Sequence, residues 1–202
     1  MPRRWLVERK KEVYYKKAKK EDMRSRAAFK IIQLNERYKL IKQGNKILDL
    51  GSAPGGWLKA IKEMVGGEGL IIGIDIQPIL PIEGVITIIG DITNENIIEE
   101  IKKINPIFDV ITSDCSPNVS GNWNLDHARQ IYLAEKALDL CHNLLKLKGN
   151  FIVKVFQGEF FEEFINNMRK KFFKVIITKP EASRKKSSEV YILGKSFNLK
   201  RD

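Results

Sequence analysis

The sequence contains little cysteine and histidine, and none of its hydrophobic runs is long. Among its 202 residues there are two cysteines, Cys115 and Cys141, and two histidines, His127 and His142. Two thiols without a CxxC pair cannot build a disulfide framework or a zinc cage, and two histidines leave no histidine-rich site, so we expect no metal centre. No apolar stretch approaches the roughly 18 residues of a membrane helix. The amino end, MPRRWLVERKKEVYYKK, has no apolar signal-peptide core, so we expect a cytoplasmic protein without a membrane segment.

Positive charge is in excess and is concentrated at the amino end. The net charge is +11, and residues 1–26 carry eleven Lys/Arg against four Asp/Glu, which places +7 of it in that block. Such a block attracts polyanions by counterion release, most often nucleic acid, although a Lys/Glu-rich surface typical of heat-loving organisms would also fit. We expect residues 1–26 to form a basic arm or helix that binds RNA. Its Trp5, Tyr14 and Tyr15 either stack on unpaired bases or pack against the core.

Hydrophobic periodicity predicts alternating strands and helices beyond this block. Strands separated by helices of ten or more residues indicate a doubly wound, mostly parallel α/β sheet with helices on both faces. We expect one domain over residues 27–202, with Gly44 and Gly149 ending the helices that precede them. The predicted helices are 26–41, 58–65, 94–103, 126–147 and 159–171, and Ser25 is the predicted N-cap of the first. The predicted strands are 46–50, 70–75, 85–89, 108–113, 150–156, 172–178 and 189–194.

A glycine-rich loop, Gly51–Trp57, follows the first predicted strand, where doubly wound sheets bind ligands. Its G-x-x-x-G-G spacing differs from the G-x-G-x-x-G of a pyrophosphate binder, which disfavours a dinucleotide-dependent dehydrogenase. Asp75 closes the second strand, where a carboxylate can accept hydrogen bonds from both ribose hydroxyls of an adenosyl group. Asp91 closes the third strand and could accept from an adenine amino group. Either aspartate alone could instead cap a helix or turn, but the three successive strand ends together indicate an adenosyl site.

Five motifs resemble those of the FtsJ-type (RrmJ-type) RNA ribose 2′-O-methyltransferases. They are Arg24–Lys30, Asp49–Trp57, Asp109–Pro117, Phe151–Gln157 and Ser183–Tyr191, and together they span nearly the whole chain. The resemblance implies a Rossmann-like class I fold with a seven-stranded sheet, and S-adenosylmethionine as the cofactor. The cofactor-binding residues that we expect are Gly51, Pro54, Gly55, Gly56, Trp57, Asp75, Ile76, Asp91, Ile92 and Asp114.

Four charged residues, Lys30, Asp114, Lys154 and Glu189, stand at positions where the pattern is apolar or a strand ends, and such groups normally need a partner. The resemblance implies that they are the family's Lys-Asp-Lys-Glu tetrad. In this class the last strand runs antiparallel, so its start would lie with the carboxyl ends of the others. We expect Lys154 at the centre, as a base or as an ammonium that orients the 2′-oxygen. Asp114 would position it, Lys30 tune the local field and Glu189 orient the ribose.

The expected substrate is a ribose, in uridine, of large-subunit ribosomal RNA or of the assembled subunit. Arg184, Lys185 and Lys186 precede Glu189 and could grip RNA at the rim of the site. Two alternatives stay open: 2′-O-methylation of a transfer RNA anticodon loop, and a non-catalytic RNA-binding factor in ribosome assembly. Four retained charged positions argue against the second. We expect the protein to act as a monomer.

Overall fold

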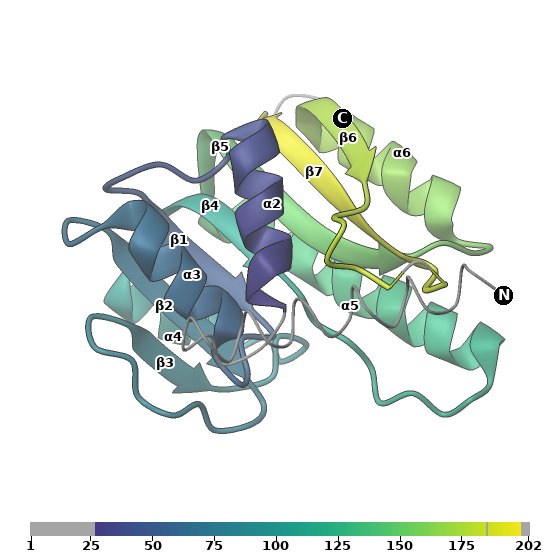
Figure 1. Ribbon diagram of the computed structural model, residues 1–202, viewed down its shortest axis with the longest axis horizontal. Helices are drawn as coiled ribbons and strands as arrows, with labels where there is room; N and C mark the ends of the chain where they lie inside the picture. The colour runs from purple at the N-terminus through teal and green to yellow at the C-terminus, as the bar shows by residue number, and fades with distance from the viewer. Residues whose placement is uncertain (1–26, 185, 199–202) are drawn as a thin grey trace, which may run out of the picture.

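The central sheet has seven strands in the order β3-β2-β1-β4-β5-β7-β6, in a computed structural model that describes residues 27–184 and 186–198 (Figure 1). Neighbouring strands pair in parallel except at β7, which runs antiparallel to both β5 and β6. This confirms the predicted doubly wound, mostly parallel sheet. The strands are β1 (Lys46–Leu50), β2 (Leu70–Asp75), β3 (Ile86–Ile89), β4 (Phe108–Ser113), β5 (Leu145–Phe156), β6 (Phe172–Thr178) and β7 (Glu189–Phe197).

Helices cover both faces of the sheet. One apolar cluster joins α2 and α3 to one face, and a larger cluster joins α4, α5 and α6 to the other. In Figure 1, α2 and α3 lie in front of the sheet. Alternate residues of the buried strands point to opposite faces, so each cluster receives every second side chain. The helices are α2 (Ala28–Tyr38), α3 (Gly56–Val65), α4 (Ile97–Ile104), α5 (Trp123–Leu144) and α6 (Phe161–Lys171).

The predicted end of the first helix was wrong by three residues. The helix ends at Tyr38 because Lys39 adopts the left-handed conformation, with φ 53°, and donates its N–H to Asn35 O. The Asn35 side chain then accepts from Ile41 N at 2.8 Å, which holds the chain after the helix. Gly44, with φ 73°, lies in the turn that leads into β1.

The end of α5 was also predicted wrongly. The helix begins at Trp123, where the Asn122 side chain accepts from Leu125 N, and it ends at Leu144. Strand β5 starts at the next residue, five residues earlier than predicted, and Leu145 pairs with Phe108 of β4. Gly149 therefore lies inside the strand and ends no helix.

The basic arm at residues 1–26, the predicted N-cap Ser25 and Lys185 lie outside the described residues. Within the described ranges, no helix has both the length and the apolarity to cross a bilayer. The same ranges contain no group of three or more His, Cys, Asp or Glu side chains that could hold a metal ion.

Candidate active site

A hollow of about 460 Å³ opens at the carboxyl ends of β1, β2, β3 and β4. It lies where β2 and β4 pair with opposite sides of β1, the switch point at which doubly wound sheets bind ligands. Its volume is within the range of small-molecule sites. The residues predicted to bind cofactor that line it are Gly51, Pro54, Asp75, Ile76, Asp91, Ile92 and Asp114.

The loop after β1 approaches the segment after β4 so closely that Gly51 has no room for a side chain. Its φ is 73°, and a Cβ at this position would lie 2.8 Å from three atoms of Cys115. Gly51 N donates to Ile74 O at 2.8 Å, which ties the loop to the end of β2. Glycine is required here for both its backbone conformation and its lack of a Cβ.

Two carboxylates on the wall of the hollow are oriented by main-chain donors. Asp75 accepts from Ala53 N at its Oδ2 and from Gln77 N at its Oδ1, both at 2.9 Å. Asp91 Oδ1 accepts from Thr93 N and Thr93 Oγ1, both at 2.8 Å. A carboxylate has about four acceptor positions, so each can still accept from a ligand. The geometry is therefore compatible with the predicted contacts to ribose hydroxyls and an adenine amino group.

Three of the predicted cofactor residues lie outside the lining of the hollow. Gly55, with φ 99°, is the N-cap of α3, and Gly56 begins that helix. Trp57 is buried, donates from Nε1 to Ala27 O at 2.9 Å and packs against Tyr191 with ring centroids 5.8 Å apart. Its contacts join α2 to the sheet, and its part in cofactor binding stays a prediction.

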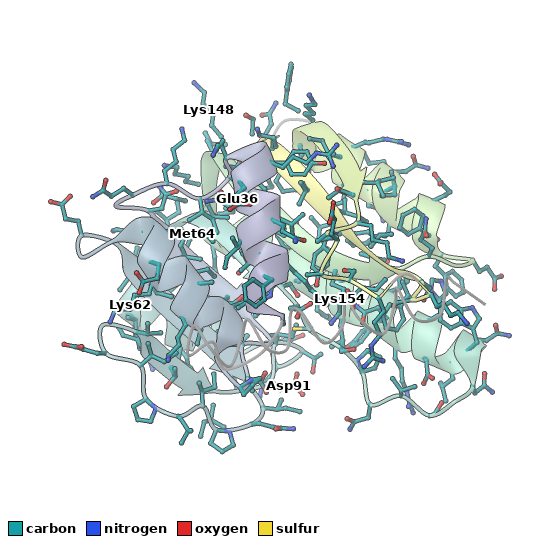
Figure 2. The ribbon with its side chains drawn as sticks, viewed as in Figure 1. Glu36, Lys62, Met64, Asp91, Lys148 and Lys154 are labelled. Carbon is teal, nitrogen blue, oxygen red and sulfur yellow. The ribbon has the colours of Figure 1, made fainter. Side chains whose placement is uncertain are left out.

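The four predicted catalytic residues come together as two ion pairs. Lys154 Nζ lies 3.2 Å from Asp114 Oδ1 and donates to Asp114 O at 2.7 Å. Lys30 Nζ lies 2.6 Å from Glu189 Oε1. Figure 2 shows Lys154 close to the amino-terminal end of α2, the end that carries Lys30. Both lysines are largely buried, so each depends on its carboxylate partner.

Tyr191 connects the two pairs, and the sequence reasoning missed it. Its hydroxyl donates to Asp114 Oδ1 at 2.7 Å, and its ring centroid lies 5.5 Å from Lys30 Nζ. It is opposite Lys154 in the register of β5 and β7, two residues after Glu189. Burial, reinforced by neighbouring carboxylates, raises the pKa of Tyr191 well above its ordinary value, so the phenol keeps its proton. The i, i+2 spacing from Glu189 was the signal available in the sequence.

Two further side chains hold the pairs in place. Ser183 Oγ donates to Glu189 Oε1 at 3.0 Å, and Gln130 Nε2 donates to the main-chain oxygen of Lys154 at 2.9 Å. Gln130 is on α5, so both layers of helices contribute to the site. Each of these contacts fixes a charged residue without adding a charge.

Asp49 is a fully buried acid at the base of the loop. Its Oδ1 accepts from Thr112 Oγ1 at 2.6 Å, and no residue of 27–184 or 186–198 donates to its Oδ2. Burial raises the pKa of Asp49 from 3.8 to about 7. Burial likewise raises the pKa of Cys115, at the edge of the hollow, to about 12, which makes it an unreactive thiol.

The residues around the hollow fit S-adenosylmethionine. Carboxylates at the ends of β2 and β3 suit hydroxyl and amino groups, whereas Ile76, Pro78, Ile92 and Leu133 offer apolar surface for a flat ring. The tetrad adjoins the hollow through Asp114, which belongs to both. The arrangement can therefore hold a small adenosyl ligand and a polar group from a second substrate side by side.

Sequence comparisons agree with this arrangement. The family model described as FtsJ-like methyltransferase matches residues 23–197. The chain is 48% identical over 205 residues to the ribosomal RNA large subunit methyltransferase E of Methanocaldococcus jannaschii, covering 98% of this chain and 84% of that protein. It is 49% identical over 190 residues to the protein of the same name from Methanosarcina mazei, covering 93% and 70%.

Solved structures have the same fold. A Plasmodium falciparum protein assigned as a ribosomal RNA methyltransferase superposes with a TM-score of 0.78 at 30% identity, over 88% of this chain and all of that chain. Fibrillarin from Aeropyrum pernix, with natively bound S-adenosylmethionine, has a TM-score of 0.61 at 16% identity, over 85% and 75% of the two chains, and supports the fold alone. The chain belongs to the FtsJ-like methyltransferase family, whose cofactor is S-adenosylmethionine.

Proposed function

We propose that the protein transfers a methyl group from S-adenosylmethionine to a ribose 2′-hydroxyl in large-subunit ribosomal RNA. One observation carries the proposal: Asp114 lines the hollow and also holds the ammonium of Lys154, with Nζ and Oδ1 3.2 Å apart. A hydroxyl bound by Lys154 therefore lies beside the cofactor site. The names of the archaeal relatives support ribosomal RNA of the large subunit as the substrate.

Lys154 holds the attacking oxygen in this proposal. Its Nζ has three donors, and two of them meet Asp114 O and Asp114 Oδ1. The third donor is left for the 2′-oxygen. Because both protein neighbours of Nζ are acceptors, the site suits an ammonium, and we assign Lys154 the orienting role in preference to that of a base. Asp114 positions it, and Tyr191 positions Asp114.

The Lys30–Glu189 pair acts on the ribose. Glu189 Oε1 already accepts from Lys30 Nζ and Ser183 Oγ, which fixes the carboxylate at the opening of β7. A fixed carboxylate can accept from a ribose hydroxyl and so set the sugar's orientation. Lys30 compensates the negative charge of Glu189, so the site holds two lysines and two carboxylates without net charge.

S-adenosylmethionine, when bound, supplies an electrophilic methyl group attached to a positively charged sulfur. The chain's own residues align the 2′-oxygen and exclude alternative orientations. As the bond from the 2′-oxygen to the methyl carbon forms, the carbon–sulfur bond would break and its electron pair would stay on the sulfur, which becomes a neutral thioether; the 2′-proton, now far more acidic, would leave to water. The site therefore needs accurate positioning more than a strong base.

Basic segments of the chain provide the RNA contacts outside the tetrad. Arg184 and Lys186 are exposed in the loop before β7, and the block at residues 1–26 supplies further cations. We propose that these two regions bind phosphates around the target nucleotide, which we propose is a uridine. We also propose that the protein acts as a cytoplasmic monomer, with one catalytic domain over residues 27–202.

Methyl transfer from labelled S-adenosylmethionine tests the proposal, with total transfer RNA, naked ribosomal RNA and isolated large subunits lacking the modification as substrates. We expect label in the large-subunit RNA. Label in transfer RNA alone would move the function to an anticodon loop. Tight cofactor binding with no label in any fraction would instead favour a non-catalytic assembly factor.

A further inference from the structure

Four aromatic side chains stack beside the tetrad, and nothing in the mechanism uses them. The Trp123 cluster consists of Trp123, His127, Phe156 and Phe160. The Trp123 and His127 centroids are 5.9 Å apart with planes at 19°, Trp123 and Phe156 are 6.0 Å apart at 20°, and His127 and Phe160 are 5.7 Å apart at 4°. Near-parallel rings at these distances are offset stacks.

His127 sits inside the cluster and is rigidly held. Its Nε2 accepts from Phe160 N at 3.1 Å. The ring also packs directly against the backbone of Gly158, where an added Cβ would lie 2.7 Å from it. Burial lowers the pKa of His127 although the nearby Glu159 carboxylate acts the other way. The imidazole is therefore neutral, and the cluster presents flat, uncharged rings.

The outer rings of the cluster are open to solvent. Trp123 is 47% exposed and Phe160 is 40% exposed, whereas His127 is buried between them. Packing of α5 onto the sheet is already provided by the apolar residues of the larger core cluster, to which Trp123 does not belong. An indole that is held by two ring contacts and is still 47% exposed offers surface to a ligand.

The cluster lies next to the site of methyl transfer. Phe156, which stacks on Trp123, is two residues after Lys154 in β5, roughly 7 Å further along the strand and at its carboxyl end. Gln130, which binds the Lys154 carbonyl, is seven residues after Trp123 on the same face of α5. Lys154 and the Trp123 cluster therefore share the carboxyl-end edge of the sheet, and an RNA strand bound at Lys154 can extend along this edge to Trp123.

The segment that links the cofactor hollow to Trp123 is also fixed. The buried Asp126 carboxylate accepts from Ser120 N and Ser120 Oγ at 2.8 Å, and from Gly121 N at 3.1 Å. These bonds anchor the loop that begins at Asp114. They hold the end of this loop against the first turns of α5, the helix that begins at Trp123.

We propose that an unpaired RNA base adjacent to the methylated ribose stacks on Trp123. The identity of the ligand as RNA rests on the proposed function. Aromatic rings bind bases of any identity through their faces, and a neutral cluster suits a base better than a phosphate. Glu159, close to His127, would repel a phosphate there, whereas the phosphates have basic segments elsewhere to bind them.

The test uses the full-length protein and a single-stranded oligouridine that carries one 2-aminopurine. Stacking quenches 2-aminopurine fluorescence, and the titration gives an affinity. Two variants separate stacking from packing: Trp123→Phe keeps an aromatic face, and Trp123→Leu keeps apolar bulk without one. We expect wild type and Trp123→Phe to quench the probe, and Trp123→Leu to bind it about 5- to 100-fold more weakly, with S-adenosylmethionine affinity unchanged.

Phe173→Leu is the matched control, since Phe173 is 86% exposed on edge strand β6, near the end of β7 that is remote from Glu189. The proposal is overturned if wild type leaves the probe unquenched, if Trp123→Leu binds like wild type, or if Phe173→Leu loses as much affinity as Trp123→Leu. Binding of the probe requires no methyl transfer, so this test can contradict stacking on Trp123 without contradicting the proposed function. Absence of label in ribosomal RNA would count against the function alone.

Discussion

The cofactor hollow and the tetrad share an edge of the sheet, but main-chain groups shape the first and side chains form the second. In the hollow, main-chain groups set the shape: Gly51 allows two segments to touch, and backbone N–H groups orient Asp75. In the tetrad, side chains from distant parts of the chain meet, with Lys30 and Glu189 separated by 159 residues. The hollow should therefore be sensitive to added atoms, and the tetrad to removed ones.

The largest expected effect is the loss of methyl transfer in Lys154→Ala. Removing a donor that stabilises the reacting oxygen costs roughly 10²- to 10³-fold in turnover, and the hollow keeps its shape because Lys154 does not line it. Single-turnover assays and cofactor titration measure the two effects. Lys148→Ala, an exposed lysine near the start of the same strand (Figure 2), is the control. Equal loss of cofactor affinity in Lys154→Ala would contradict the division between the two regions.

The converse change, Gly51→Ala, should act on the cofactor first. The new Cβ would lie 2.8 Å from Cys115 at a positive φ, so the loop must shift, and we expect S-adenosylmethionine to bind about tenfold or more weakly by calorimetry. Gly44→Ala separates strain from contact, because Gly44 has the same φ of 73° with nothing within 4 Å of its added Cβ. If both variants bind cofactor equally well, the close approach at Gly51 has no functional role.

Removal of the Tyr191 hydroxyl should have an intermediate effect. Tyr191→Phe keeps the ring against Trp57 and Lys30 but takes one donor from Asp114. A hydrogen bond to a charged group contributes about 1.5–3 kcal/mol, and we expect roughly a tenfold drop in kcat with KM for S-adenosylmethionine unchanged. A larger change in KM than in kcat would show that Tyr191 serves the hollow and not the tetrad.

The smallest expected effect on methyl transfer is that of Asp49, which lies between the two regions and whose buried carboxyl group acts on the free energy of unfolding. Its pKa rises from 3.8 to about 7 in the folded protein, so between about pH 4 and 7 the folded state holds a proton that the unfolded state releases. The Asp49 contribution to the free energy of unfolding therefore falls as pH rises through this window, by up to about 1.4 kcal/mol per pH unit, and levels off above it. Asp49→Asn should remove that contribution in urea unfolding at several pH values. If plots of the free energy of unfolding against pH are parallel for wild type and Asp49→Asn, the assigned pKa is contradicted.

The same contrast explains which features the sequence could predict. Strands β1, β2, β4 and β6 have the predicted bounds, because each is a short apolar run that ends at a polar or turn residue. The start of β5 could not be predicted, since Leu145 and Leu147 fit a helical period as well as a strand. Their pairing with β4, a tertiary contact, decides the outcome.

The four charged residues of the tetrad could be found because charge at an apolar position is conspicuous. Tyr191 could not be found in this way, because a tyrosine in a strand is ordinary; its spacing from Glu189 was a weak signal, which the register with Lys154 makes specific. Trp57 illustrates the opposite case. It follows the glycine loop in sequence, yet the first turn of α3 directs it into the core, away from the lining of the hollow.

The most direct test of ribose 2′-O-methylation is the chemical position of the transferred methyl group. Large-subunit RNA labelled by the wild-type protein should be digested with alkali, which cannot cleave next to a 2′-O-methylated ribose. We expect label in alkali-stable dinucleotides, and no such label with Lys154→Ala. Label recovered in mononucleotides would mean methylation of a base, and it would contradict the assignment of the tetrad to ribose 2′-O-methylation.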